Sequence, residues 1–176
     1  MDDHTHGLHI RQGGPADAPA ILAMLDSAVA WMNTRGNTGQ WGTKPYSRIP
    51  SAVARIDQYT TEKLPFVAEL DGKPVGALAL GSGPSPQTPM PPADEPERYV
   101  RLLVSHREYA GPGIGAALLA RAVEETRRAG ADLLRVDCWA GGGGELVAYY
   151  ERTGFTPTDR FLSGTWPGQV LARRVG

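Results

Sequence analysis

The stretch from Tyr99 to Phe155 constrains the fold most strongly, because it predicts a strand, a glycine-rich turn, a helix, a second strand and a second helix. The turn lies between the apolar run 99–104 and the helical run 116–120, and it reads Ala110-Gly111-Pro112-Gly113-Ile114-Gly115. Glycines let the backbone approach a ligand closely, and the first N–H groups of a helix have no partner inside it. Such groups favour an anion, so the sequence predicts a phosphate or pyrophosphate site at residues 110–116.

Two known phosphate-binding turns fit these residues poorly. A P-loop ends in Gly-Lys-Ser or Gly-Lys-Thr, whereas Gly115 is followed by two alanines, which supply neither a lysine nor a hydroxyl group. A dinucleotide-binding turn reads G-x-G-x-x-G, whereas the glycines at 111, 113 and 115 are evenly spaced. Asp137 does lie where such a fold places its ribose-binding acid, but the chain lacks further alternating strands and helices. A nucleotide-dependent oxidoreductase stays an alternative, as does a glycine turn that only packs a helix on a strand.

The second helix of this stretch helps to choose among these alternatives. Residues 144–155 predict a short helix that ends at Gly154, with Leu146 and Tyr150 on one face. A glycine-rich anion turn, a strand, and a helix whose tyrosine comes four residues before Gly-Phe together resemble the GNAT superfamily of acyl-CoA N-acyltransferases. The resemblance is specific over residues 98–156 and looser elsewhere.

The resemblance implies a fold, an acyl donor and a set of binding residues. The implied fold is α/β (α+β), with a mixed central sheet of about six to seven strands, splayed at the middle and flanked by about four helices. The donor would be acetyl-CoA or another acyl-CoA, its thioester carbonyl held by a backbone N–H at the end of the central strand. The residues implied to contact CoA are Leu103, Val104, Ser105, Ala110, Gly111, Pro112, Gly113, Ile114, Gly115 and Ala116.

Two positions depart from the pattern of the superfamily. Ala110 occupies the place of an arginine or glutamine that often helps to bind the pyrophosphate, so backbone N–H groups would carry that role. Gly143 occupies the place of an asparagine, within the run Gly141–Gly144, which suggests a flexible turn between strand and helix. Both departures leave open the alternative that the protein binds CoA as a sensor or interaction module and does not catalyse acyl transfer.

Tyr150 is the candidate catalytic residue, as the acid that protonates the departing thiolate. A phenol with a pKa of about 10 is protonated at neutral pH, whereas a thiol has a pKa of about 8.5. The alternative for Tyr150 is an aromatic side chain that packs on the core face of its helix. Tyr149 points elsewhere on the helix and is interpreted as a core or rim residue.

The general base is left open among Asp137, Glu108 and His106. Strand alternation predicts Asp137 and Trp139 on one face and Cys138 on the other. Asp137 would then meet the acceptor amine, or pair with an arginine such as Arg101 or Arg135. His106 and Glu108 are interpreted as members of a solvated loop.

The acceptor pocket is implied to involve the first two helices, their connecting loop and nearby strand ends. The residues that map there and to the second strand are Trp31, Gln40, Trp41, Asp137 and Trp139. The connecting loop carries no acidic cluster, which argues against a polycationic acceptor such as an aminoglycoside or a polyamine. A smaller amine, or an amino-acid-like acceptor, is at least as consistent with these residues.

Composition bounds the remaining choices. The 176 residues fit one domain, 1–176, and the net charge of −1 gives no electrostatic footprint for nucleic acid. Cys138 is the only cysteine, and no apolar run approaches the ~20 residues of a membrane helix. We therefore expect a cytoplasmic protein with no membrane partner and no metal. The resemblance also implies that the protein could form a homodimer through its terminal strands.

The rest of the chain predicts a regular order of elements. Residues 8–11 predict a strand, 15–35 and 51–59 predict helices, and Asp71-Gly72 between two apolar runs predicts a hairpin. Residues 81–96 predict a long, mobile solvent loop because they are rich in proline, serine and glycine. Two terminal strands are predicted, joined by a loop that contains Trp166-Pro167-Gly168.

Overall fold

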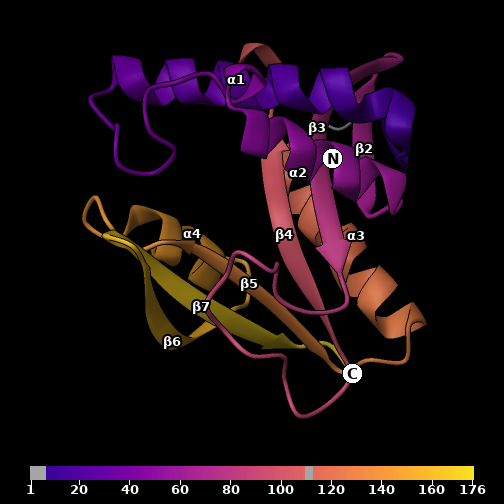
Figure 1. Ribbon diagram of the computed structural model, residues 1–176. Helices are drawn as coiled ribbons and strands as arrows, with labels where there is room; N and C mark the ends of the chain where they lie inside the picture. Colours follow the sequence, from indigo (N-terminus) through magenta and orange to yellow (C-terminus); the bar gives the residue numbers. More distant parts are fainter. Residues whose placement is uncertain (1–6, 110–112) are drawn as a thin grey trace. The chain divides into compact units, whose positions relative to one another are not determined.

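The computed structural model describes residues 7–109 and 113–176, and its chain divides into two compact units (Figure 1). The first unit comprises the residues up to Ala79 together with Leu102–Arg121, and the second comprises Leu80–Arg101 and Ala122–Gly176. The boundaries fall inside two strands and one helix, so these three elements each contribute residues to both units. A single domain over 1–176 stays a prediction.

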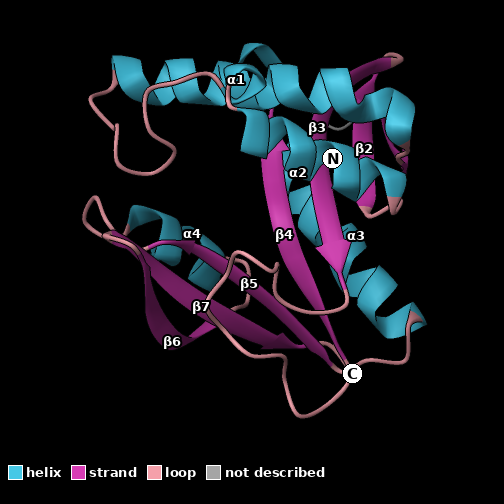
Figure 2. Cartoon of the chain, viewed as in Figure 1, coloured by secondary structure: helices cyan, strands magenta, loops and turns pink. Residues whose placement is uncertain are grey.

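The elements follow the order expected from the sequence (Figure 2). The helices are α1 (Ala18–Thr34), α2 (Pro50–Thr61), α3 (Ile114–Arg128) and α4 (Glu145–Arg152). The strands are β1 (Leu8–Gln12), β2 (Pro65–Leu70), β3 (Lys73–Gly81), β4 (Glu97–Ser105), β5 (Leu133–Trp139), β6 (Thr156–Ser163) and β7 (Trp166–Arg174). They form a seven-stranded sheet in the order β1-β2-β3-β4-β5-β7-β6. The predicted α/β class with a mixed sheet is confirmed.

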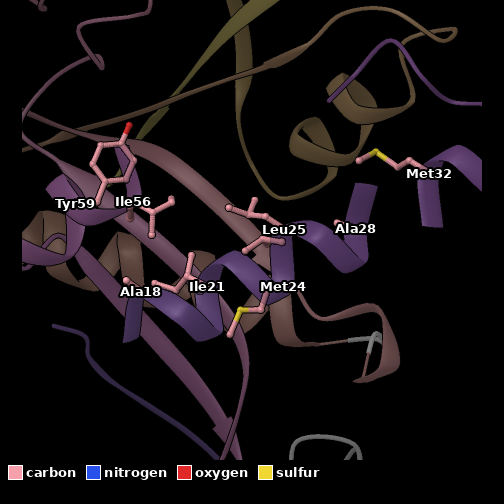
Figure 3. Close-up of a cluster of buried hydrophobic side chains, with 11 residues drawn as sticks. Ala18, Ile21, Met24, Leu25, Ala28, Met32, Ile56 and Tyr59 are labelled. Atoms are coloured by element: carbon pink, nitrogen blue, oxygen red, sulfur yellow. The ribbon is translucent and has the colours of Figure 1, made fainter. Parts of the chain in front are cut away.

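The first unit holds a core between α1, α2 and one face of the sheet. Apolar residues recur at helical spacing along α1 and form one cluster with Ile56 and Tyr59 of α2 (Figure 3). Ala77 and Ala79 of β3 belong to the same cluster. The neighbouring Gly76 faces the other way, where an added Cβ atom would lie 2.7 Å from Ile114 Cγ2 and 3.2 Å from Leu118 Cδ1. Strand alternation therefore sends the two alanines to α1 and α2, and the absence of a side chain at Gly76 lets α3 pack closely.

The hairpin between β2 and β3 turns where the sequence predicts. Asp71 and Gly72 have φ angles of +52° and +80°. Positive φ at both central residues matches the twist of the flanking strands and explains the Asp-Gly pair. The two strands are antiparallel, with Leu70 opposite Lys73.

The second unit contains one parallel strand pair and a terminal hairpin. Residues 97–100 of β4 pair in parallel with residues 133–136 of β5, while β7 runs antiparallel to both β5 and β6. The predicted position of the last loop is wrong, because Trp166, Pro167 and Gly168 lie within β7 and Ser163 pairs with Trp166. Gly168 pairs with Trp139 of β5 and Phe161 of β6, and the Phe161 ring lies 2.1 Å from where a Cβ atom would stand, which explains a glycine in this strand.

The loop between β3 and β4 is tied to its own unit at several points. Arg101 Nε donates to the Gly83 carbonyl at 2.9 Å, and Arg135 Nη2 donates to the Pro91 carbonyl at 3.1 Å. The Ala93 N–H donates to Glu97 Oε2 at 2.7 Å. Residues 82–96 thus form neither helix nor strand, in line with the predicted loop, while Gly81 belongs to β3. Side chains of the neighbouring strands hold the loop backbone.

None of the helices formed by residues 7–109 and 113–176 combines the length and the apolar character needed to cross a membrane.

Candidate active site

The start of α3 provides the described part of the predicted anion turn. Among the described residues, the first hydrogen bond of this helix runs from the Ala117 N–H to the Gly113 carbonyl, at 2.8 Å. The N–H groups of Gly113, Ile114, Gly115 and Ala116 therefore precede the helical ladder, where anions bind. Gly113 has a φ of +115°, a conformation that side chains other than glycine rarely adopt. Ala110, Gly111 and Pro112 lie outside the described residues.

The end of β4 lies in the first unit with the start of α3. Val104 is buried in the core cluster, whereas Leu103 and Ser105 are half-buried. The N–H of the next residue, His106, donates to the Val75 carbonyl at 2.8 Å and so ties the strand end to β3. The role predicted for residues 103–105, to hold a thioester carbonyl, stays a prediction.

Tyr150 is a buried side chain of α4, the helix that contacts β5 and β6 in the second unit. Its ring packs edge-on against Tyr149 and Phe155, with centroid separations of 5.3 Å and 5.8 Å. Burial, and then the nearby Cys138 thiol, Tyr149 and Asp137, raise the pKa of Tyr150 above its usual value. The hydroxyl makes no hydrogen bond to any residue that the structure describes. The Tyr150 phenol is therefore protonated at neutral pH.

The glycine run before α4 is explained by Trp139. An added Cβ atom at Gly141 would lie 2.3 Å from the Trp139 ring, and one at Gly142 would lie 2.8 Å from it. Gly142, Gly143 and Gly144 also have positive φ angles, of +64°, +84° and +77°. The glycines thus let the backbone pass close to the indole ring of Trp139. The substrate-binding role of Trp139 stays a prediction.

Asp137 pairs with a tyrosine, so the predicted pairing with an arginine is wrong. The Tyr99 hydroxyl donates to Asp137 Oδ2 at 2.8 Å, and Thr88 Oγ1 of the long loop lies 3.5 Å from the same oxygen. Arg135 binds Glu97 and Arg101 binds loop carbonyls instead. Burial raises the pKa of Asp137 despite these hydrogen bonds. A partly buried carboxylate with a raised pKa suits a proton acceptor, and the choice of base among Asp137, Glu108 and His106 stays a prediction.

Replacing Asp137 with asparagine is expected to change the pH dependence of stability. The ordinary pKa of this carboxyl is 3.8, and burial raises it in the folded protein. The folded state therefore binds this proton more tightly, so the contribution of Asp137 to stability is greatest below pH ~4 and is lost as pH rises through the raised pKa. Asparagine still accepts the Tyr99 hydroxyl but does not ionise. Denaturant unfolding at pH 4 and pH 7 should find the variant relatively more stable at pH 7, and a pH-independent difference would contradict this reasoning.

The predicted acceptor residues of the first unit border its core cluster. Trp31 and Trp41 both pack against the cluster, and the Trp41 ring lies 5.7 Å from that of Tyr46. The Gln40 side-chain oxygen accepts a hydrogen bond from Asn37 at 3.2 Å, which orders the loop after α1. The binding of an acceptor by Trp31, Gln40 and Trp41 stays a prediction.

Sequence reasoning missed the two arginines that lie over Trp31. Arg35 ends α1, and Arg107 lies in the short 3-10 helix η4 (Arg107–Tyr109) before the anion turn. Neither residue belongs to a motif, so only proximity to the turn marks Arg107 in the sequence. Glu108, one of the base candidates, is exposed, and its N–H donates to His106 Nδ1 at 3.2 Å.

Within residues 7–109 and 113–176, no group of three or more histidine, cysteine, aspartate or glutamate side chains is placed to hold a metal ion.

The mixed sheet, with α3 between β4 and β5, is the arrangement expected of the acyl-CoA-dependent transferases that the sequence resembles. Residues 27–155 match the model of the Acetyltransferase (GNAT) family. Because this match spans well over half of the chain, the protein belongs to that family. No curated protein matches the chain.

Solved structures of this fold include several acetyltransferases. A GNAT-family acetyltransferase from Listeria monocytogenes superposes with a TM-score of 0.71 at 19% identity, covering 95% of this chain and 94% of the other. A Salmonella typhimurium protein, described as an acetyltransferase with acetyl-CoA as its cofactor, has a TM-score of 0.66 at 19% identity, covering 97% and 95%. The ribosomal-protein-alanine N-acetyltransferase from Brucella melitensis has a TM-score of 0.63 at 23% identity, covering 94% and 99%.

Proposed function

We propose that the protein is an N-acetyltransferase that moves an acetyl group from acetyl-CoA to a primary amine of a small molecule or peptide. Membership of the GNAT family over residues 27–155 is the observation that carries this proposal. The acetyl-CoA cofactor named for the Salmonella protein supports the choice of donor. The N–H groups of Gly113–Ala116 lie at the start of α3, where a helix favours an anion such as a pyrophosphate, and this position also supports the proposal.

The reaction is direct attack within a ternary complex. The amine nitrogen bonds to the thioester carbonyl carbon, the carbon–sulfur bond breaks, and the products are an amide and CoA. A backbone N–H at residues 103–105 of β4 polarises the carbonyl oxygen, which carries the developing negative charge. The Tyr150 hydroxyl gives its proton to the departing thiolate, and the amine loses its proton to Asp137 or to water.

Binding of CoA is the experiment that tests this proposal most directly. Calorimetry should detect acetyl-CoA and desulfo-CoA with similar affinity, because both carry the pyrophosphate, while NAD and ATP serve as controls. A screen of amines monitored by thiol release then tests transfer. Binding of NAD with no binding of CoA would overturn the proposal in favour of a dinucleotide protein.

A CoA-binding sensor is the second candidate, and it is favoured by Ala110 and Gly143 where the superfamily has polar side chains. A sensor binds acetyl-CoA but releases no thiol with any amine of a broad panel.

We also propose a single domain, a cytoplasmic location and a homodimer through the terminal strands. Gel filtration with light scattering tests the last of these.

A further inference from the structure

Two arginines lie over the indole ring of Trp31 in the first unit. The Cζ atom of Arg107 is 3.6 Å from the ring centroid, and the Cζ atom of Arg35 is 4.5 Å from it. Each contact is a cation–π interaction, which orients a guanidinium group without neutralising it. Two positive charges are therefore gathered at the end of α1.

Among the described residues, neither cation has a carboxylate partner, and the buried Arg107 Nε has no hydrogen-bond partner. Burial and the charge of Arg35 lower the pKa of Arg107. Other arginines do find carboxylates, namely Arg11, Arg128, Arg135 and Arg174. A buried donor left without a partner is unfavourable, so the pair on Trp31 favours a negatively charged ligand.

The backbone holds Arg107 in this position. The Arg107 N–H donates to Ser27 Oγ at 3.1 Å, and Ser27 Oγ donates to the Met24 carbonyl of α1 at 2.8 Å. Trp31 itself packs against the core cluster, as do Trp41 and Tyr46. The two cations thus lie over an indole ring that packs against the core, an arrangement that suits a small ligand with an anionic group.

We propose that Arg35 and Arg107 bind an oxyanion of the acceptor, so that the acceptor is an amino-acid-like amine with a free carboxylate. This inference rests on the proposed function, because it names the acceptor class of the same reaction. A guanidinium group can bind a carboxylate through two parallel hydrogen bonds. Because the Arg107 guanidinium already packs on the Trp31 ring, it loses less conformational entropy when a ligand binds. The 3′-phosphate of CoA offers the same oxyanion chemistry.

Calorimetry with product analogues tests the inference without any need for turnover. The probes are the N-acetyl derivatives of the twenty amino acids and the carboxamides of the same compounds, titrated into CoA-saturated protein. At least one free acid should bind about tenfold or more tightly than its carboxamide, because the charged hydrogen bonds are lost in the amide. The variants Arg35→Gln and Arg107→Gln should each reduce this preference.

The control variant is Arg48→Gln, which removes the same charge from an exposed position of the first unit and should keep the preference. Arg35 is exposed, so its variant is expected to fold. Equal binding of acids and carboxamides would overturn the inference. A variant that loses affinity for CoA but not for dephospho-CoA would overturn it too, by assigning the oxyanion to the donor. Thiol release without a carboxylate preference would leave the proposed function standing and reject only this inference.

Discussion

Replacement of Tyr150 with phenylalanine is expected to lower the rate of acetyl transfer by about 100-fold or more while leaving the affinity for acetyl-CoA unchanged. The change removes only the hydroxyl, and the ring keeps its packing against Tyr149 and Phe155. Because burial raises the pKa of Tyr150, the wild-type phenol stays protonated at neutral and mildly alkaline pH. Turnover measured by thiol release, with binding measured by calorimetry, separates the two effects.

Tyr149→Phe is the matched control, because Tyr149 is the neighbour of Tyr150 on the same helix and is only half-buried. It should turn over at close to the wild-type rate. Equal rates for Tyr150→Phe and the wild type would contradict the assignment of Tyr150 as the acid. Tyr150 would then be a packing residue, and water would protonate the departing thiolate. An alkaline fall in rate below pH ~10 would belong to another group, since the pKa of Tyr150 lies above its usual value.

Local patterns were enough to predict most elements of this fold. Helical spacing marks α1, and Asp71-Gly72 marks the β2–β3 hairpin. Gly154 marks the end of α4, because its positive φ of +100° suits the residue that closes a helix. Each of these signals depends on residues that are close together in the sequence. A local sequence pattern is therefore enough to predict the helix, the hairpin or the helix end.

Contacts between distant segments could not be predicted in the same way. Asp137 meets Tyr99 because β4 and β5 pair in parallel, a register that no single segment reveals. Gly168 follows a proline and suggests a turn, yet it lies in a strand. A glycine is needed there because the Phe161 ring occupies the space of a side chain. The described candidate residues therefore lie on the expected elements, whereas their hydrogen-bond and ion-pair partners depend on contacts between distant segments.

The buried ion pair between Glu97 and Arg135 supports the second large prediction. Glu97 Oε1 accepts from Arg135 Nε at 2.6 Å and Oε2 accepts from Nη2 at 2.8 Å, with side-chain exposures of only 2% and 10%. Glu97→Gln leaves the buried guanidinium without a counter-charge, which costs about 3–5 kcal/mol of stability. In a chain of this size that should lower the midpoint of thermal unfolding by about 10 °C.

Glu95→Gln is the control, because Glu95 forms an ion pair with Arg174 at the surface, where solvent screens the charges. It should melt like the wild type. The double variant Glu97→Gln with Arg135→Met removes the orphaned cation and should recover part of the loss. A Glu97→Gln protein with the wild-type midpoint would contradict the assignment.

The same pair should also control access to the loop 81–96. Glu97 accepts the Ala93 N–H and Arg135 donates to the Pro91 carbonyl, so loss of the pair releases both anchors. A protease that cleaves after acidic residues should therefore cut faster at Asp94 in Glu97→Gln than in the wild type. Because Thr88 of this loop lies against Asp137, release of the loop would also expose a proposed proton acceptor. An unchanged cleavage rate in a destabilised variant would mean that the ion pair stabilises the sheet without holding the loop.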